Sequence, residues 1–311
     1  MRESPGLVSV QSRLLIGLMR AVGLRRWLGR AFRRRGRPDP HGGGITAMTR
    51  RPPAGARVTP VDAGGSPAAW VTPLAANSGA VIYYLHGGGY VFGAMDTYRD
   101  LLGRLTQLTG ARALWLDYRL APECPFPAAV DDALAGYRWL LAQGAAPEAI
   151  VFSGDSAGGG LALATMLAAR DAGLPLPAGG ALLSPWTDLT GESETAISRA
   201  AVDPMLIGAH IAEGGQRYLA GADPRHPLAS PLYADLRGLP PLLIHVGDNE
   251  TLLDDSRKLA ERARAAGVEV TLRVWDSMFH VFPIFPTLLP EARKAVDEMV
   301  SFILARVSRS A

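Results

Sequence analysis

Residues 154–158, GDSAG, place a serine at the centre of a G-x-S-x-G pattern. An apolar run at 149–152 precedes the pattern, and a run of small residues typical of a helix, 159–170, follows it. A sharp turn from strand to helix strains the backbone of the central serine, and the two glycines avoid clashes across the turn. The Ser156 hydroxyl is then exposed above a sheet, beside the free N–H groups of a helix start. The pattern therefore predicts a nucleophilic serine.

A serine hydroxyl is a weak nucleophile unless a base removes its proton. The chain has six histidines, and His280 lies in the loop after a predicted strand, residues 270–275. Open α/β sheets build their sites at the carboxyl ends of their strands, which is the edge that Ser156 also occupies. His245 lies inside an apolar run, where a core role is expected. We therefore predict His280 as the base.

An imidazole base needs a carboxylate that holds its tautomer and stabilises its charged form. Four acidic residues follow the predicted strand at 241–246, namely Asp248, Glu250, Asp254 and Asp255. The chain order of nucleophile, acid and histidine is that of α/β-hydrolases. We favour Glu250 because it lies in the loop itself, and we keep Asp248 and Asp254 as alternatives. Asp254 and Asp255 are expected to begin a helix, where carboxylates are common.

Attack on a carbonyl group creates an oxyanion, which needs N–H donors fixed in advance. Residues 86–89, HGGG, follow a predicted strand at 80–85. A glycine backbone can approach a ligand closely because no side chain intervenes. With the N–H group of Ala157, this loop can supply two or three donors. We expect the His86 side chain to orient the loop through hydrogen bonds.

The elements that must position these residues alternate along the chain. Apolar runs that predict buried strands lie at 80–85, 113–117, 149–153, 180–184, 241–246 and 268–275, with predicted helices between them. This alternation predicts an α/β fold with a mostly parallel sheet flanked by helices. Runs at 58–61 and 69–72 predict an antiparallel hairpin at the sheet edge. Residues 186–236 break the alternation and predict a helical insertion over the carboxyl edge of the sheet.

Charge is distributed unevenly along the 311 residues. The first 51 residues hold 12 arginines and two acidic residues, whereas the rest hold 20 basic and 27 acidic residues. The pI of 9.2 therefore reflects the N-terminus. No nucleic-acid partner is expected, because no basic face with interleaved aromatic residues follows. Neither glycine run has the spacing of a nucleotide-binding loop, so no nucleotide cofactor is expected.

Residues 7–35 are expected to form one kinked or two short amphipathic helices, with Leu14, Leu18 and Val22 on one face. Three interpretations stay open: a lid over the active-site mouth, which we favour, peripheral contact with an anionic membrane, or a basic tail. Residues 36–56, rich in glycine, proline and arginine, are interpreted as a linker. No run approaches the roughly 20 apolar residues that span a bilayer.

Cys124 is the single cysteine and cannot form an intramolecular disulfide, which favours a reducing, cytoplasmic location. The residues around it give it no catalytic or metal-binding role. The predicted chemistry needs neither a metal nor an organic cofactor.

Five motifs together resemble one family. The sequences HGGGY at 86–90, DYRLAPE at 117–123, GDSAGG at 154–159, LLDD at 252–255, and His280 are similar to those of the hormone-sensitive-lipase-like (bacterial family IV) carboxylesterases of the α/β-hydrolase superfamily. The resemblance covers about residues 57–306. It implies oxyanion donors from Gly88, Gly89 and Ala157, with Gly87 supporting the loop.

The resemblance also implies a cap over an acyl pocket, formed by residues 1–50 and 186–236. The family's acid precedes its histidine by about the interval from Glu250 to His280, although many members have aspartate there. Residues 51–311 would then form the catalytic domain that carries the insertion.

Together these inferences predict a serine carboxylesterase that hydrolyses short- to medium-chain acyl esters through an acyl-serine intermediate. A lactone hydrolase, deacetylase or amidase with the same three residues is an alternative, as is a non-catalytic ligand-binding member of the fold. The expected partner is a small-molecule ester, and a homodimer is possible.

Overall fold

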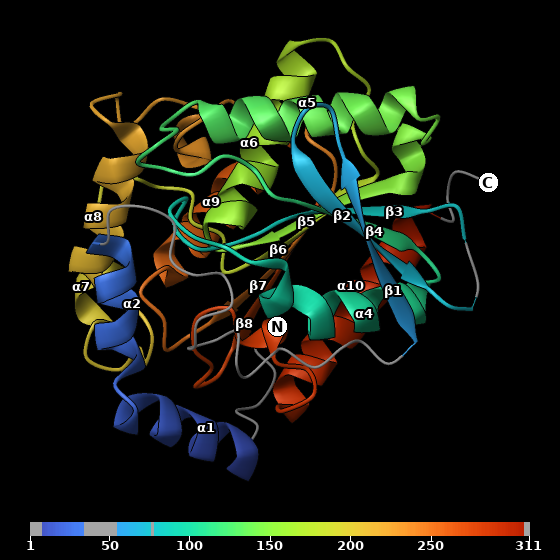
Figure 1. Cartoon of the computed structure of the whole chain (residues 1–311). Helices are drawn as coiled ribbons and strands as arrows, with labels where there is room; N and C mark the ends of the chain where they lie inside the picture. Colours follow the sequence, from blue (N-terminus) through green and yellow to red (C-terminus); the bar gives the residue numbers. More distant parts are fainter. Residues whose placement is uncertain (1–7, 34–54, 76–77, 308–311) are drawn as a thin grey trace.

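An eight-stranded sheet forms the centre of the computed structural model, which describes residues 8–33, 55–75 and 78–307 (Figure 1). The strands are β1 (Ala56–Asp62), β2 (Pro67–Pro73), β3 (Val81–Leu85), β4 (Arg112–Leu116), β5 (Ile150–Asp155), β6 (Gly179–Leu183), β7 (Leu242–Gly247) and β8 (Val270–Trp275). Their spatial order is β1-β2-β4-β3-β5-β6-β7-β8. The pairs from β4 through β8 are parallel, whereas β1 and β2 form an antiparallel edge hairpin. The predicted α/β fold with a mostly parallel sheet is confirmed.

The burial of each strand matches the apolar or mixed character of its sequence. Every residue of β3, β5, β6 and β7 is buried, as expected for strands covered on both faces. The edge strands β1 and β8 contain exposed residues instead.

Helices cover both faces of the sheet (Figure 1). The helices α5 (Ala128–Ala142), α6 (Ala157–Asp171) and α9 (Leu253–Ala265) lie on one face, and α4 (Met95–Thr109) and α10 (Pro290–Val307) pack together on the other. Helix α4 begins without a capping side chain, although Asp96 and Thr97 lie in its first turn. The N-cap is Ala94, which makes no side-chain capping bond, and Asp96 pairs with Arg99 at 2.5 Å instead.

The predicted insertion, residues 186–236, contains α7 (Glu194–Ser198), α8 (Gly208–Leu219) and the 3-10 helix η2 (Pro231–Tyr233), and no strand. Short 3-10 helices also occur at η1 (Pro147–Ala149) and η3 (Phe282–Ile284).

Two short helices, α1 (Val10–Ala21) and α2 (Leu24–Arg33), precede the sheet and meet at Gly23, where φ is +68°. Helix α2 packs against α8, and α1 contacts α10 (Figure 1). The buried side chains of α1 are Ser12, Leu15 and Met19. No helix among the described residues is long and apolar enough to cross a membrane. Residues 1–7 and 34–50 of the predicted cap segment, and nearly all of the predicted linker at 36–56, fall outside the described residues.

Candidate active site

The backbone turns sharply between β5 and α6, and Ser156 occupies the turn. Its φ of 52° and ψ of −123° are strained for a residue with a side chain. The flanking glycines are needed, because a Cβ atom at Gly158 would lie 2.1 Å from the Leu85 carbonyl oxygen, and one at Gly154 would lie 2.4 Å from that of Gly158. The predicted strand–turn–helix arrangement around Ser156 is present.

His280 lies beside this serine although the two residues are 124 positions apart in the chain. The His280 Nε2 atom is 2.9 Å from the Ser156 Oγ atom, a hydrogen-bond distance. The histidine sits in the loop between β8 and η3 and is 3% exposed. An unprotonated Nε2 atom can therefore accept the serine proton directly.

Glu250, in the loop between β7 and α9, is the carboxylate that faces His280. Its Oε1 atom is 3.6 Å from His280 Nδ1, within ion-pair range but longer than a hydrogen bond. Neither atom has another hydrogen-bond partner among the described residues. The Oε2 atom accepts hydrogen bonds from Ser184 Oγ at 2.8 Å and from the Gly247 N–H group at 3.2 Å. The fully buried carboxylate is thus held by one oxygen and presents the other to the imidazole.

The alternative acids have other partners. The Asp248 carboxylate accepts the N–H group of Ser277, and the Asp254 carboxylate accepts the N–H group of Thr195. The geometry therefore favours Glu250 over Asp248 and Asp254.

Two opposing effects set the protonation of His280. Burial lowers the pKa of His280, but attraction to Glu250, with contributions from Asp203 and Asp155, raises the pKa above its ordinary value of 6.5 overall. The carboxylates therefore stabilise the imidazolium form that arises when the base takes a proton.

The glycine loop begins where β3 ends. His86 is fully buried and stacks on Tyr118 with ring centroids 4.1 Å apart, and its Nδ1 atom lies 2.8 Å from the Gly87 carbonyl oxygen. Gly88 has a φ of +114°, and a Cβ atom there would lie 1.9 Å from the Phe92 carbonyl oxygen. Only glycine fits this backbone path without a clash.

Three N–H groups near the serine stay available to a ligand. Within the described part of the chain, no hydrogen bond uses the N–H groups of Gly88, Gly89 or Ala157. Ala157 opens helix α6 directly after Ser156, where N–H groups favour negative charge. These donors are the ones that the sequence motifs indicate for an oxyanion.

Asp155 joins the serine turn to the glycine loop, a role that the sequence analysis missed. Its buried carboxylate accepts the Gly87 N–H group at 2.8 Å and the hydroxyl groups of Tyr84 at 2.9 Å and Tyr98 at 3.3 Å. Burial raises the pKa of Asp155 to about 6, although the hydrogen bonds from Tyr84 and Gly87 oppose this rise. The sequence signal for this role is the position of Asp155 next to Ser156 in the G-x-S-x-G motif. Ser184, which contacts Glu250, carried no signal in the sequence.

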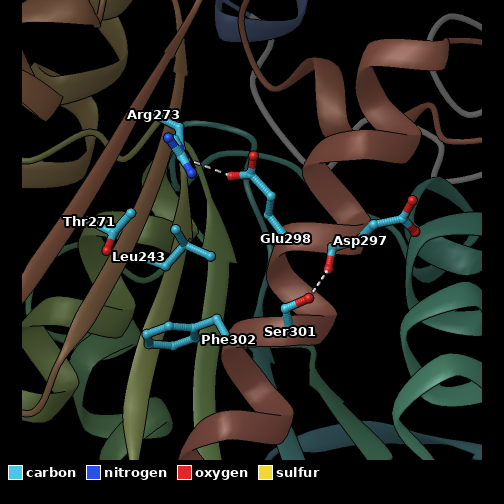
Figure 2. Close-up of a pocket in the computed structure, with 7 residues that line it drawn as sticks. All are labelled: Leu243, Thr271, Arg273, Asp297, Glu298, Ser301 and Phe302. Carbon is cyan, nitrogen blue, oxygen red and sulfur yellow. Dashed lines mark hydrogen bonds and ion pairs between the residues drawn. The ribbon is translucent and has the colours of Figure 1, made fainter. Parts of the chain in front are cut away.

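A surface groove between β8 and α10 contains none of these residues (Figure 2). It is lined by Leu243, Thr271, Arg273, Asp297, Glu298, Ser301 and Phe302. Its charged side chains pair with one another or with neighbours, Arg273 with Glu298 at 3.0 Å and Asp297 with Arg104 at 3.6 Å. The groove therefore offers no nucleophile and base in contact.

No group of three or more His, Cys, Asp or Glu residues in the described ranges is arranged to hold a metal ion.

Comparison with known proteins agrees with the α/β fold described above. The sequence model of a family described as having the alpha/beta hydrolase fold matches residues 82–284. An acetyl-hydrolase of Streptomyces hygroscopicus is 48% identical over 243 residues, which are 78% of this chain and 81% of the relative.

Solved structures agree with the sequence relatives. A crystal structure of EstE5 soaked with p-nitrophenyl butyrate superposes with a TM-score of 0.84 and 42% identity, and the match covers 96% of this chain and 99% of that one. An esterase from the bacterial hormone-sensitive lipase family gives a TM-score of 0.84 and 41% identity, over 99% of this chain and 100% of that one.

Proposed function

This chain belongs to the hormone-sensitive-lipase-like branch of the α/β-hydrolase fold family and is a carboxylic ester hydrolase, and we propose that Ser156, His280 and Glu250 carry out its reaction. The observation that carries this proposal is the 2.9 Å contact between His280 Nε2 and the hydroxyl of a strained serine. A serine and a histidine in direct contact at the carboxyl edge of a parallel sheet form the arrangement that acyl transfer needs.

The first half of the reaction forms an ester bond to Ser156. The Oγ atom attacks the carbonyl carbon as His280 Nε2 takes its proton, and Glu250 stabilises the resulting imidazolium. The N–H groups of Gly88, Gly89 and Ala157 donate to the oxyanion. His280 then gives the proton to the leaving alcohol, and the acyl group stays on the serine oxygen.

The second half releases the acid. His280 takes a proton from water, the resulting hydroxide attacks the acyl carbon, and the same N–H groups hold the second oxyanion. The proton returns to Ser156 as the carbon–oxygen bond to the enzyme breaks. Water is the only co-reactant, so the free enzyme is regenerated.

Short- to medium-chain acyl esters are the proposed substrates. The support is the similarity to a protein named as an acetyl-hydrolase and to one soaked with a butyrate ester. The p-nitrophenyl esters of acetate, butyrate and palmitate test this, with Ser156→Ala as the control. Higher kcat/KM on palmitate than on butyrate would contradict the proposed chain length, and unchanged hydrolysis by Ser156→Ala would contradict the proposed nucleophile.

A deacetylase is a second candidate, favoured by the name of the acetyl-hydrolase relative. The same residues would act on an acetylated alcohol, and a lactone hydrolase or amidase would use them likewise. Release of acetate from acetylated alcohols, compared with release from p-nitrophenyl acetate, separates a deacetylase from a general esterase.

We propose that α1, α2 and the helices of the insertion form a cap beside the site. The support is the contact of α2 with α8 and two hydrogen bonds, from Arg20 Nη2 to the Val202 carbonyl oxygen at 3.0 Å and from Arg25 Nη2 to that of Ala200 at 2.6 Å. Deletion of residues 1–33 should then raise KM or lower kcat on butyrate esters. Unchanged values for both would contradict the cap.

One apolar row of α1 faces away from the core. Val10, Leu14, Leu18 and Val22 are 57%, 69%, 52% and 67% exposed. Neither α1 nor α2 contains an acidic residue, and together they carry six arginines. We propose that this row contacts an anionic membrane from the cytoplasm, since an apolar row next to cationic side chains suits such a surface; the lone Cys124 supports that compartment.

Co-sedimentation with vesicles of anionic phospholipid tests the membrane contact. Binding that falls in high salt and in Leu14→Glu supports it. A dimer in sedimentation experiments that Leu14→Glu dissolves, without vesicle binding, would assign the row to a second copy of this chain instead.

A further inference from the structure

Asp203 is a fully buried carboxylate that the proposed reaction does not use. It lies between α7 and α8, and its Oδ1 atom accepts the N–H groups of Met205 at 2.8 Å and Leu206 at 2.9 Å. Its Oδ2 atom accepts the N–H group of Thr251 at 2.9 Å and the Thr251 hydroxyl at 3.3 Å. Each oxygen accepts two of these hydrogen bonds. Burial raises the pKa of Asp203, whereas the backbone hydrogen bonds oppose this rise and favour the ionised form.

The residue that Asp203 holds is the neighbour of Glu250 in the chain. Thr251 is held a second time by the insertion, because the Thr195 hydroxyl on α7 donates to the Thr251 carbonyl oxygen at 3.0 Å. Thr195 Oγ1 also accepts the N–H group of Asp254 at 3.0 Å. The backbone that follows Glu250 is therefore fixed by side chains of the insertion.

Three carboxylates act on the imidazole of His280. Glu250 lies in the loop after β7, Asp155 at the end of β5, and Asp203 in the insertion, and the charge of each raises the pKa of His280. Burial of the imidazole has the opposite effect. The charge of Asp203 therefore adds to that of Glu250 in stabilising an imidazolium.

We propose that Asp203 is a positioning residue for the reaction, which fixes Glu250 opposite His280 through Thr251 and stabilises the imidazolium by its charge. The inference rests on the proposed roles of Ser156, His280 and Glu250. It explains why the Glu250 carboxylate stays aligned although its Oε1 atom is 3.6 Å from the imidazole.

The same segment connects the site to the N-terminal helices. Arg25 and Arg20 donate to the carbonyl oxygens of Ala200 and Val202, three residues and one residue before Asp203. Helices α1 and α2 therefore hold residues 200–203, and Asp203 in turn holds the loop that carries Glu250. Loss of these arginine contacts should lower kcat, as loss of Asp203 should, but by a smaller factor.

The test compares Asp203→Asn with Asp188→Asn. Asp188 is also a buried carboxylate of the insertion, but it accepts from Thr190 and Tyr233 and is not among the groups that act on His280. Asp203→Asn should lower kcat by about 10- to 100-fold, the range for a misplaced catalytic group, with little change in KM. The acid limb of its kcat/KM profile should move to lower pH, because removal of a negative charge lowers the pKa of the base. Asp188→Asn should leave the limb in place.

Active sites in the Asp203, Asp188 and Arg25 variants are counted by titration with a p-nitrophenyl phosphonate, so that misfolded protein is not mistaken for slow protein. Asp203→Glu keeps the charge but shifts it, and it should lower kcat with a smaller change in the acid limb. If Asp203→Asn does not fold, Arg25→Gln tests the positioning role from helix α2, with a loss of kcat about 2- to 10-fold, as expected for one lost hydrogen bond.

The proposal is overturned if titrated Asp203→Asn has the kcat and acid limb of the unmodified protein, or if Asp203→Asn fails to fold and Arg25→Gln keeps full kcat. Ser156→Ala and His280→Gln are measured in parallel. Full activity in these two variants would contradict the proposed function itself, whereas their inactivity with an unchanged Asp203→Asn would contradict only the role of Asp203.

Discussion

The hydroxyl of Ser184 donates a hydrogen bond to Oε2 of Glu250 at 2.8 Å. The Ser184 Oγ atom also accepts the N–H group of Val281 at 3.1 Å, so one serine at the end of β6 connects the loop of the acid to the loop of His280. Its backbone has a φ of 46°, an uncommon value for a residue with a side chain. Ser184 therefore sets the relative position of the two loops.

We predict that Ser184→Ala lowers kcat about tenfold and the free energy of unfolding by about 1–3 kcal/mol, because it leaves the buried Val281 N–H group without an acceptor. Ser153→Ala is the matched control. The Ser153 hydroxyl is equally buried and donates to the Ala181 carbonyl oxygen at 2.8 Å within the sheet. It should lose stability but not kcat. Equal losses of kcat in both variants would contradict a specific role for Ser184.

Glu250→Gln should lower kcat by about 10³-fold or more, as expected when the acid of such a triad loses its charge. The base works only when His280 is neutral, so kcat/KM falls as the pH drops through the pKa of His280. Glu250 raises that pKa, and the acid limb of the variant should therefore lie at lower pH.

Asp248→Asn is the control for this prediction, since the Asp248 carboxylate instead accepts the Ser277 N–H group. It should keep most of the activity and the position of the acid limb. A larger loss in Asp248→Asn than in Glu250→Gln would move the catalytic acid to residue 248.

His245 should make the fold sensitive to acid. Burial and the charge of Arg273 lower the pKa of His245 to about 3, and the Glu298 carboxylate 3.9 Å away does not offset burial. The unfolded chain binds a proton at this imidazole near pH 6.5, the ordinary value, whereas the folded chain does so only near 3. Stability is therefore lost as the pH falls from about 6.5 toward about 3.

Urea unfolding at several pH values measures this effect. His245→Gln keeps an acceptor for the Trp275 indole N–H group, which donates to His245 Nδ1 at 2.9 Å. The variant should lose less stability than the unmodified protein across that pH range. An identical dependence on pH in the two proteins would show that His245 does not cause the acid sensitivity.

Gly88→Ala should abolish most of the esterase activity, because the new Cβ atom would meet the Phe92 carbonyl oxygen at 1.9 Å and displace the glycine loop. Loss of one oxyanion donor costs about 10²- to 10³-fold in kcat. Gly65→Ala is the control: Gly65 also has a positive φ, of 92°, but nothing lies within 4 Å of an added Cβ atom. It should cost about 1 kcal/mol in stability and keep the activity. Retained activity in Gly88→Ala would contradict the proposed oxyanion loop.

The strands were predictable because buried strands have continuous apolar sequences. The turn at Ser156 was predictable because its glycine pattern is fixed by the geometry of the turn. The residues that the sequence did not reveal act across long separations. Ser184 and Glu250 are 66 residues apart, and Asp203 and Thr251 are 48 apart. A lone buried serine or aspartate has no local pattern, and its partners are defined only once the loops meet at the sheet edge.

The N-terminal helices illustrate a second limit. Periodicity placed Leu14, Leu18 and Val22 on one apolar face of a helix. The structure buries Leu15 with Met19 and leaves the other three exposed. Two apolar rows compete on this helix, and packing against the rest of the fold decides between them.

The most direct test of the proposed nucleophile is covalent labelling by a p-nitrophenyl phosphonate, followed by peptide mass spectrometry. We predict one equivalent of p-nitrophenol released per chain, loss of esterase activity in step with labelling, and the phosphonyl group on the Ser156 peptide alone, with no labelling of Ser156→Ala. Labelling of a different residue in step with inactivation, or full hydrolysis of p-nitrophenyl butyrate by Ser156→Ala, would contradict it.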